Sequence, residues 1–245
     1  LNITNSDIEF NDVHFFYNPD RLILSNFSLQ ISKGTQIAIV GKTGSGKSTI
    51  ARLLFRFYDP QQGDIYIDKQ KISDVTLNSL HQNIGVVPQD TVLFNDTILY
   101  NLKYGNQNAN FDQIQSAAKS ACIDDFINSL PNGYNTVVGE RGLKLSGGEK
   151  QRIGIARTIL KDASIMLLDE STSSLDYTTE KKILANLKKD KKNSTMIVIS
   201  HRLSAITDVD KIIVLNFGKI IEQGTHLELM NAEGEYFKLW QNQDV

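Results

Sequence analysis

The chain has 245 residues but a single cysteine, Cys122, which excludes an internal disulfide and fits a reducing compartment weakly. No apolar run approaches the roughly 20 residues that a membrane-spanning helix needs. Residues 1–7 lack the basic and apolar regions of a signal peptide. We therefore expect the chain to be soluble by itself, while the missing starting Met leaves open that it is cut from a larger membrane protein.

The sequence also lacks an excess of charge of either sign. It contains 26 Lys and Arg against 28 Asp and Glu, which gives a net charge of −2 and a pI of about 6.1. Because no strong basic field is available to attract nucleic acid, we expect no nucleic-acid partner. The length suffices for a sizeable core, either as one large domain or as a core with an inserted subdomain.

A glycine-rich segment, GKTGSGKST, occupies residues 41–49. It fits the phosphate-loop pattern, in which glycines let the backbone approach an anion and successive amides point at phosphate oxygens. Residues 35–40 predict a buried strand before it. After the loop, helical spacing of apolar residues predicts one face of a helix, formed by Ile50, Leu53, Leu54 and Phe57. Asp59-Pro60 is expected to end this helix. The candidate nucleotide ligands are Gly41, Thr43, Gly44, Ser45, Gly46, Lys47, Ser48 and Thr49.

The N-terminal part predicts β structure over residues 8–31, with a turn at Tyr17-Asn18-Pro19-Asp20. Tyr17 has two interpretations. It is either an ordinary half-buried aromatic or an exposed ring on which a purine stacks, and position alone favours the first.

Three further buried strands are predicted, each followed by polar residues: 84–87 by Gln89, 165–168 by Asp169-Glu170, and 196–199 by Ser200-His201. In parallel α/β sheets, ligands bind beyond the carboxyl ends of the strands. The acidic pair suggests Mg²⁺ coordination and activation of water. A lone histidine is more often structural than catalytic, but the position of His201 at a strand end favours a role.

Helical pieces are predicted over residues 97–130, and a second helix start follows at Leu145-Ser146-Gly147-Gly148-Glu149. Ser146 and Glu149 form a capping box. The two glycines cost about 1 kcal/mol each inside a helix, so close approach of a ligand would explain them. Helix starts bind anions through unsatisfied amides and the helix dipole. A β-hairpin over residues 212–222 and one helix over about 225–242 are expected to close the chain.

Together, these motifs resemble the nucleotide-binding domain of an ABC transporter over essentially the full length. Residues 41–49, 145–149 and 165–170 look like Walker A, the ABC signature and Walker B. The signature separates this family from other phosphate-loop ATPases. The minor motifs fall in order as well: Tyr17 matches the A-loop, Gln89 the Q-loop, 173–176 the D-loop and His201 the switch histidine.

Residues 138–142 look like the X-loop of exporters. Together with Leu143-Lys144, they are similar to half-transporters of the mitochondrial and heavy-metal-tolerance type and to multidrug-resistance proteins. Ser171 departs from the pattern, because Ala is common after the Walker B glutamate.

The fold implied is α/β: a phosphate-loop NTPase core with a parallel sheet, an N-terminal antiparallel β portion and an inserted α-helical subdomain. We expect residues 1–89 and 159–245 to form the ATP-binding core. Residues 90–158 would form the helical insertion that carries the signature.

The resemblance implies hydrolysis of ATP with Mg²⁺. Tyr17 would stack on adenine, and Lys47 and the loop amides would hold the phosphates. The implied ligands of Mg²⁺ are Ser48, Gln89 and Asp169. Glu170 would polarise the attacking water, alone or together with His201, which would contact the γ-phosphate.

Two such domains are implied to pack head to tail, with each ATP between Walker A of one and the signature of the other: Ser146, Gly147, Gly148 and Glu149. The presence of two separate phosphate-binding helix starts gives this arrangement a physical reason. From the sequence, the two could also meet within one chain. A transmembrane domain, in the same or a partner chain, would couple hydrolysis to export. It would place this domain at a membrane, facing the cytosol or the mitochondrial matrix.

Three alternatives stay open. An importer-type or free-standing ABC ATPase subunit would be excluded by about six membrane helices upstream of Leu1. An ABC ATPase acting on DNA or ribosomes would need basic patches or long coiled-coil insertions, and neither is present. A metabolic kinase using the same loop would leave the signature unexplained, and phosphate release without an acceptor would discriminate it.

Overall fold

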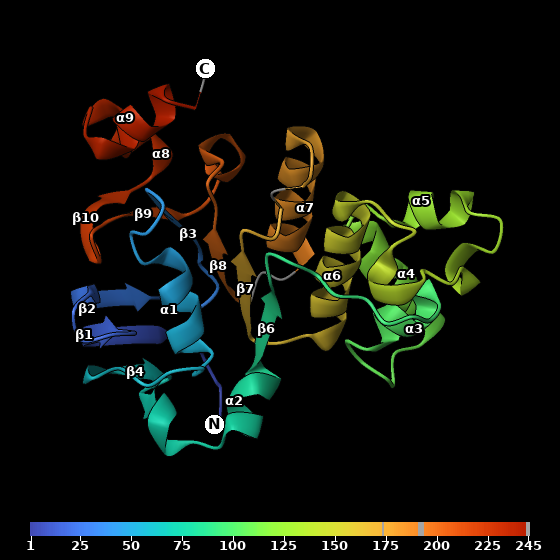
Figure 1. The fold of residues 1–245 in the computed structure, drawn as a ribbon, viewed down its shortest axis with the longest axis horizontal. Helices are drawn as coiled ribbons and strands as arrows, with labels where there is room; N and C mark the ends of the chain where they lie inside the picture. The colour runs from blue at the N-terminus through green and yellow to red at the C-terminus, as the bar shows by residue number, and fades with distance from the viewer. Residues whose placement is uncertain (173, 191–193, 244–245) are drawn as a thin grey trace. The chain divides into compact units, whose positions relative to one another are not determined.

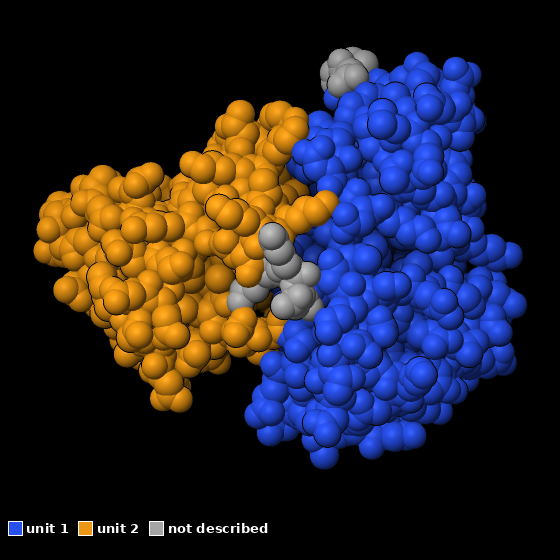
Figure 2. All heavy atoms as spheres, turned by 180° about the vertical axis from the view of Figure 1, so that it is seen from behind, with its two compact units in different colours: residues 1–84, 164–169, 193–245 blue, residues 85–163, 170–192 orange. Residues whose placement is uncertain are grey.

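The computed structural model describes residues 1–172, 174–190 and 194–243. The chain divides into two compact units, which Figure 2 shows in different colours. The first comprises residues 1–84, 164–169 and 193–245, and the second comprises residues 85–163 and 170–192. The second unit therefore takes in residues 170–192 beyond the segment predicted as an insertion.

A small antiparallel sheet of the first unit is built from the N-terminal strands. Its order is β2-β1-β4-β5, with β1 at Ile8–Phe16, β2 at Leu22–Ile31, β4 at Gln62–Ile67 and β5 at Gln70–Lys71. Apolar residues alternate along β1 and β2 and are buried, and Phe10 packs edge-on against Phe27 with ring centroids 5.4 Å apart. This is the antiparallel β portion that the sequence predicts.

Parallel strands dominate the larger sheet of the first unit. The strands that lie in this unit run in the order β10-β9-β3-β8-β7: β3 at Gln36–Gly41, β7 at Ile165–Asp169, β8 at Thr195–Ile199, β9 at Lys211–Asn216 and β10 at Lys219–Gly224. β9, β3, β8 and β7 are parallel, and β10 pairs antiparallel with β9 as the predicted hairpin. Every residue of β3 and β8 is buried, as expected of strands covered on both faces. The predicted α/β class is confirmed.

The described residues of the first unit also contain four α-helices: α1 at Lys47–Leu54, α2 at Leu77–Asn83, α8 at His226–Asn231 and α9 at Glu235–Gln241. Two short 3₁₀ helices lie at Ile72–Asp74 and Leu203–Ile206. The prediction of a single C-terminal helix is wrong, because the structure has two helices, α8 and α9, in its place. Glu233 takes a left-handed conformation (φ 49°), and Gly234 precedes α9 as a non-helical cap.

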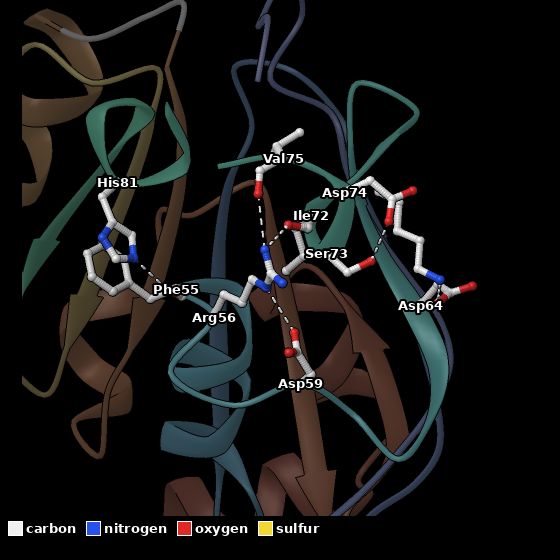
Figure 3. Close-up of polar contacts among 10 residues, drawn as sticks. Phe55, Arg56, Asp59, Asp64, Ile72, Ser73, Asp74, Val75 and His81 are labelled. Atoms are coloured by element: carbon white, nitrogen blue, oxygen red, sulfur yellow. Dashed lines mark hydrogen bonds and ion pairs between the residues drawn. The ribbon is translucent and has the colours of Figure 1, made fainter. Parts of the chain in front are cut away.

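The helix after the phosphate loop is shorter than predicted. α1 ends at Leu54, and Phe57 is 64% exposed instead of belonging to its buried face. Arg56 adopts a left-handed φ of 55°, and its guanidinium bonds Asp59 and the carbonyls of Ile72 and Val75 (Figure 3). These bonds hold residues after Leu54 in a turn. The helix therefore ends before Phe57, although the apolar spacing in the sequence extends to that residue.

The second unit is mainly helical. It begins within β6 (Ile84–Val87) and contains α3 at Ile98–Lys103, α4 at Phe111–Ser120, α5 at Asp124–Ser129, α6 at Gly147–Lys161 and α7 at Tyr177–Asp190. Two 3₁₀ helices lie at Gly133–Asn135 and Glu140–Gly142. α3 and α4 pack against α6, and the predicted apolar face of α4 is buried: Ile114, Ala117, Ala118 and Ala121. Across the described part of the chain, no helix has the length and apolar character required to cross a membrane.

A buried hydrogen bond joins α5 to the 3₁₀ turn that follows it. The hydroxyl of Tyr134 donates to Asp124 Oδ1 at 2.6 Å, and the two residues are 7% and 6% exposed. Burial and the neighbouring carboxylate both raise the pKa of Tyr134, which stays a donor at all ordinary pH values.

We expect Tyr134→Phe to lower the free energy of unfolding by about 1–3 kcal/mol, because it leaves the buried Asp124 oxygen without its donor. Urea unfolding followed by circular dichroism measures the change. Tyr100→Phe is the matched control, because Tyr100 is 49% exposed. Equal midpoints for the two variants would contradict the importance of this bond.

Candidate functional site

The carboxyl ends of three parallel strands meet at one edge of the larger sheet (Figure 1). β3 and β7 each pair in parallel with β8, and both Ile39 and Asp169 stand opposite Ile199. The phosphate loop follows β3, Asp169 ends β7, and His201 follows β8. The structure thus brings these predicted residues to the edge where parallel sheets bind ligands.

The phosphate loop makes two close approaches that require glycine. Gly41 has a φ of +149°, and an added Cβ would lie 2.2 Å from the backbone oxygen of Leu215. Gly46 has a φ of +108°, and its Cβ would lie 2.9 Å from a side-chain carbon of β2. The amide of Gly218 donates to the carbonyl of Ser45 at 3.0 Å. The loop is therefore fixed by backbone packing.

Helix α1 begins without a side-chain cap. Its N-cap is Gly46, whereas α2, α3, α4, α6 and α8 each begin with a side chain that accepts a first-turn amide. Ser45 is only 4% exposed, and its Oγ has no hydrogen-bond partner among the described residues. An uncapped helix start beside an unsatisfied buried hydroxyl fits a bound phosphate, which would accept bonds from both.

The ammonium of Lys47 is held at the loop by backbone carbonyls. Its Nζ donates to Gly41 at 2.8 Å and to Lys42 at 3.1 Å, and the residue is 4% exposed. A buried ammonium is costly unless it is hydrogen-bonded or meets an anion. These bonds keep a positive charge beside the uncapped helix start. Of the other loop residues, Thr43 and Gly44 are exposed and Ser48 is half-buried.

The residues near the loop also fit a magnesium ion that is shared with phosphate. Ser48 and Asp169 are half-buried and supply a hydroxyl and a carboxylate. Mg²⁺ in nucleotide sites uses one or two carboxylates and completes its shell with phosphate oxygens and water. Among the described residues, no group of three or more His, Cys, Asp or Glu could hold a metal. Gln89 is exposed in the second unit just after β6, so its predicted part as a ligand stays a prediction.

Tyr17 lies beside the start of α1 and is 40% exposed. Its hydroxyl lies 3.3 Å from the hydroxyl of Thr49 and accepts a bond from Arg52 at 3.0 Å. Its ring makes edge contacts with Phe15 and Tyr58 at centroid distances of 4.9 and 5.2 Å. The hydrogen bond from Arg52 to Tyr17 raises the pKa of the arginine. The ring is thus partly open and fixed in orientation, which suits the predicted stacking without testing it.

Glu170 directly follows Asp169 and adopts a left-handed conformation, with a φ of 49°. A non-glycine residue in this region carries backbone strain, which persists where the surrounding structure over-determines it and is common at active sites. His201 is exposed after β8, and its backbone carbonyl accepts a hydrogen bond from the side chain of Gln243. The catalytic parts of both residues remain predictions.

The predicted capping box at the start of α6 is confirmed. The amide of Ser146 donates to Glu149 at 2.7 Å, and the amide of Glu149 donates to the hydroxyl of Ser146 at 3.3 Å. The two glycines have a reason within the chain. A Cβ on Gly147 would lie 3.2 Å from the Ser174 hydroxyl, and one on Gly148 would lie 3.1 Å from the Ser174 carbonyl. Close packing explains these glycines, so they do not by themselves require a ligand.

The segment that resembles a D-loop begins with Ser173, which lies outside the described residues. Asp176 caps α7, since its carboxylate accepts bonds from the Thr178 hydroxyl at 2.5 Å and the Thr179 amide at 2.9 Å. These bonds lower the pKa of Asp176 far below its usual range. The carboxylate therefore stays ionised as a structural cap at neutral pH.

Gln151 is a residue of this region that the sequence interpretation misses. It is 4% exposed on α6, its amide donates to the carbonyl of Gln89 at 3.4 Å, and its oxygen accepts the amide of Ser174 at 3.1 Å. One side chain thus ties the predicted Q-loop to the segment after Walker B within the second unit. A polar residue on the buried side of an amphipathic helix is the only signal that could have identified it.

A separate cavity of about 120 Å³ lies in the first unit, under the turn after α1. Its lining includes Asp59, Asp64 and Lys71. Asp59 is bound by Arg56 at 3.0 Å and Asp64 by Lys71 at 2.6 Å, and Figure 3 draws this network. Both carboxylates already have partners within the chain. We therefore interpret this cavity as a gap left by the packing of the turn and not as a ligand site.

Comparison with known proteins identifies close relatives. A family model described as "ABC transporter" matches residues 24–173. The chain is 52% identical over 243 residues to the ATM1-type heavy metal exporter of Novosphingobium aromaticivorans, a match that covers 99% of this chain and 40% of the relative. It is 53% identical to the human mitochondrial iron-sulfur clusters transporter ABCB7, covering 96% of this chain and 32% of the relative. It therefore spans well under half the length of these proteins.

A solved structure, described as a bacterial Atm1-family ABC exporter with ATP bound, has the same fold. It matches with a TM-score of 0.96 at 51% sequence identity, over 100% of this chain and 43% of that protein. The Schizosaccharomyces pombe heavy metal tolerance protein is also similar, with 53% identity over 98% of this chain and 29% of its own length.

We expect Tyr17→Ala to weaken ATP binding by about 1–3 kcal/mol, the size of a lost stack between a base and an aromatic ring. Titration calorimetry with ATP measures the change. Tyr17→Phe keeps the ring and should bind nearly as the parent does. Parental affinity in the alanine variant would mean that Tyr17 is an ordinary half-buried aromatic.

Removing the charge of Lys47 should abolish or severely weaken nucleotide binding or turnover, because few other groups offset the phosphate charge. Lys47→Ala is compared with Lys219→Ala, which removes an exposed lysine of β10 in the same unit. Calorimetry and a phosphate-release assay provide the two readouts. Normal affinity and normal turnover in Lys47→Ala would overturn the phosphate-loop assignment.

Proposed function

The chain belongs to the ABC transporter family, and we propose that it is the ATP-hydrolysing domain of an exporter. One observation carries the proposal: the uncapped start of α1 lies beside the buried hydroxyl of Ser45 and the ammonium of Lys47. This cradle is built for a phosphate chain. Its place beyond β3, with Asp169 ending β7 at the same edge, supports hydrolysis of a nucleotide as its use.

We assign each residue a role that suits its chemistry: a stacking ring, a charge or a hydrogen-bonding group. Tyr17 stacks on adenine, while Lys47 and the loop amides hold the β- and γ-phosphates. Bound Mg²⁺ would neutralise phosphate charge, held by Ser48, Gln89 and Asp169. Glu170 accepts the proton of the attacking water as a general base, and His201 orients the γ-phosphate.

The proposed catalytic unit is a head-to-tail pair of such domains. The start of α6 offers a second helix N-terminus, with Ser146, Gly147, Gly148 and Glu149 exposed or half-buried. In the pair, this surface would contact the ATP held by the phosphate loop of the other domain. Each nucleotide would then be completed by two chains, which makes dimerisation depend on ATP.

Export requires a membrane-spanning partner, in the same polypeptide or in another one. Two of the relatives named above are described as a heavy metal exporter and an iron-sulfur clusters transporter, a third is described as a heavy metal tolerance protein, and all three are longer than this chain. We propose a cargo of the same kind, recognised by the membrane-spanning part. This domain would face the cytosol or the mitochondrial matrix, where ATP is available.

The central test uses Glu170→Gln, which keeps the shape of the side chain but removes the charge that polarises water. ATP should bind and persist without hydrolysis, and the chain should become a dimer only with ATP. Light scattering coupled to size exclusion measures the mass. Adding Ser146→Arg places a bulky side chain at the α6 start and should return the ATP-bound chain to a monomer.

Asn110→Arg in the Glu170→Gln background is the matched control. Asn110 forms the same kind of capping box at α4, so this variant loses an equivalent cap away from the proposed interface. It should still dimerise with ATP. A dimer of the Glu170→Gln, Ser146→Arg double variant would refute the shared site. A monomer of Glu170→Gln alone is weaker evidence, because the membrane partner that raises local concentration is missing.

A further inference from the structure

Helix α9 and the residues just after it contact two loops of the proposed ATP site, both within the first unit. At its start, Glu235 forms an ion pair with Lys42, with Oε1 and Nζ 2.8 Å apart. Lys42 is the second residue of the phosphate loop. Just beyond its end, Gln243 bonds the segment that carries His201. No part of the proposed mechanism uses either contact.

The start of α9 is firmly anchored. The carboxylate of Glu222 on β10 accepts the amides of Glu235 and Tyr236 at 2.5 and 3.0 Å. A Cβ on Gly234 would lie 2.2 Å from a carboxylate oxygen of Glu222, so a larger residue there would displace that side chain. Tyr236 is fully buried, and its hydroxyl lies 2.9 Å from Nδ1 of His226. The backbone at Glu235 is thus anchored to strand β10 of the sheet.

The ion pair holds a residue of the phosphate loop, Lys42, whose backbone carbonyl accepts two hydrogen bonds within the loop. The carbonyl of Lys42 accepts both the Nζ of Lys47 at 3.1 Å and the amide of Ser45 at 3.1 Å. Holding the side chain of Lys42 therefore restrains the residue whose backbone positions the key ammonium. The interaction with Lys42 lowers the pKa of Glu235, so the carboxylate is charged at neutral pH.

The second contact restrains the loop after β8. The side-chain amide of Gln243 donates to the carbonyl of His201, and its oxygen accepts the amide of Leu203 at 2.8 Å. One side chain therefore clamps the backbone on both sides of Arg202. The direction in which His201 leaves the sheet depends on this backbone.

We propose that α9 and the segment just after it form a positioning element of the ATP site, in which Glu235 holds the phosphate loop through Lys42 and Gln243 holds the loop of His201. The inference rests on the proposed function, because it assigns these residues to the same reaction. The two contacts act on different steps. Glu235 preorganises the groups that bind phosphate, and Gln243 preorganises the residue that contacts the γ-phosphate during hydrolysis.

Steady-state ATP turnover of the chain, measured at fixed protein concentration, separates the two parts. A surface ion pair is weak, so Glu235→Gln should raise KM for ATP by about two- to fivefold and leave kcat nearly unchanged. Gln243→Ala should lower kcat by about two- to fivefold, the size of one or two modest hydrogen bonds, at nearly constant KM. Glu235→Asp, which keeps the charge, should restore part of the parental KM.

Two controls remove equivalent groups that lie close by. Glu233→Gln removes a carboxylate two residues before Glu235, and Gln241→Ala truncates an exposed glutamine of α9. Both should match the parent. Lys42→Gln breaks the same ion pair from the other side, and in combination with Glu235→Gln it should raise KM no further than the larger single effect.

The outcomes are distinguishable. In one outcome, the parent hydrolyses ATP while Glu235→Gln and Gln243→Ala show the same KM and kcat as the control variants. This result would overturn the positioning element and leave the proposed function intact. If each variant changes both KM and kcat and also has a lower unfolding temperature, the proposal is overturned as well, because the two residues would then only stabilise the fold. A parent that neither binds nor hydrolyses ATP would overturn both proposals.

Discussion

Parallel pairing of β3, β8 and β7 is the constraint on which the rest of the site depends. Because the strands run in one direction and stay in register, the ends that follow Ile39, Ile199 and Leu168 fall at one edge. Because every residue of β3 and β8 is buried, a slip in register would force closely packed side chains into positions shaped for others. A phosphate loop, a carboxylate and a histidine therefore meet through backbone hydrogen bonding between strands that are distant in sequence.

The two helix starts differ in how their amides are satisfied within the chain. α6 is closed by its own Ser146 and Glu149, while α1 begins at a glycine and has no side-chain cap. Amides at a helix start need an acceptor, so the absence of a cap at α1 creates a demand that an anion meets. Lys47, held by two loop carbonyls, adds the charge. Anion affinity at this end follows from what the helix lacks as much as from what the loop contains.

Much of this architecture could be predicted from the sequence because its signals are local. Buried strands, the phosphate loop and the capping box of α6 each depend on neighbours within a few residues. The end of α1 could not be predicted, since Arg56 takes its partners from Ile72 and Val75. The packing of Gly147 and Gly148 on Ser174, the bridge made by Gln151 and the contact of Glu235 with Lys42 join segments that no periodicity links. The residues predicted for the site occupy the expected ends of strands and helices, whereas their catalytic parts depend on a bound nucleotide.

Phosphate release from ATP and Mg²⁺ by the purified chain, without any acceptor and over a range of chain concentrations, tests the central claim most directly. A site completed by two chains should release phosphate with a rate per chain that rises with concentration and then saturates as the dimer fills. Formation of ADP only when an acceptor is added, with the phosphoryl group transferred to that acceptor, would identify a kinase instead. Absence of both binding and release at every concentration would contradict the account.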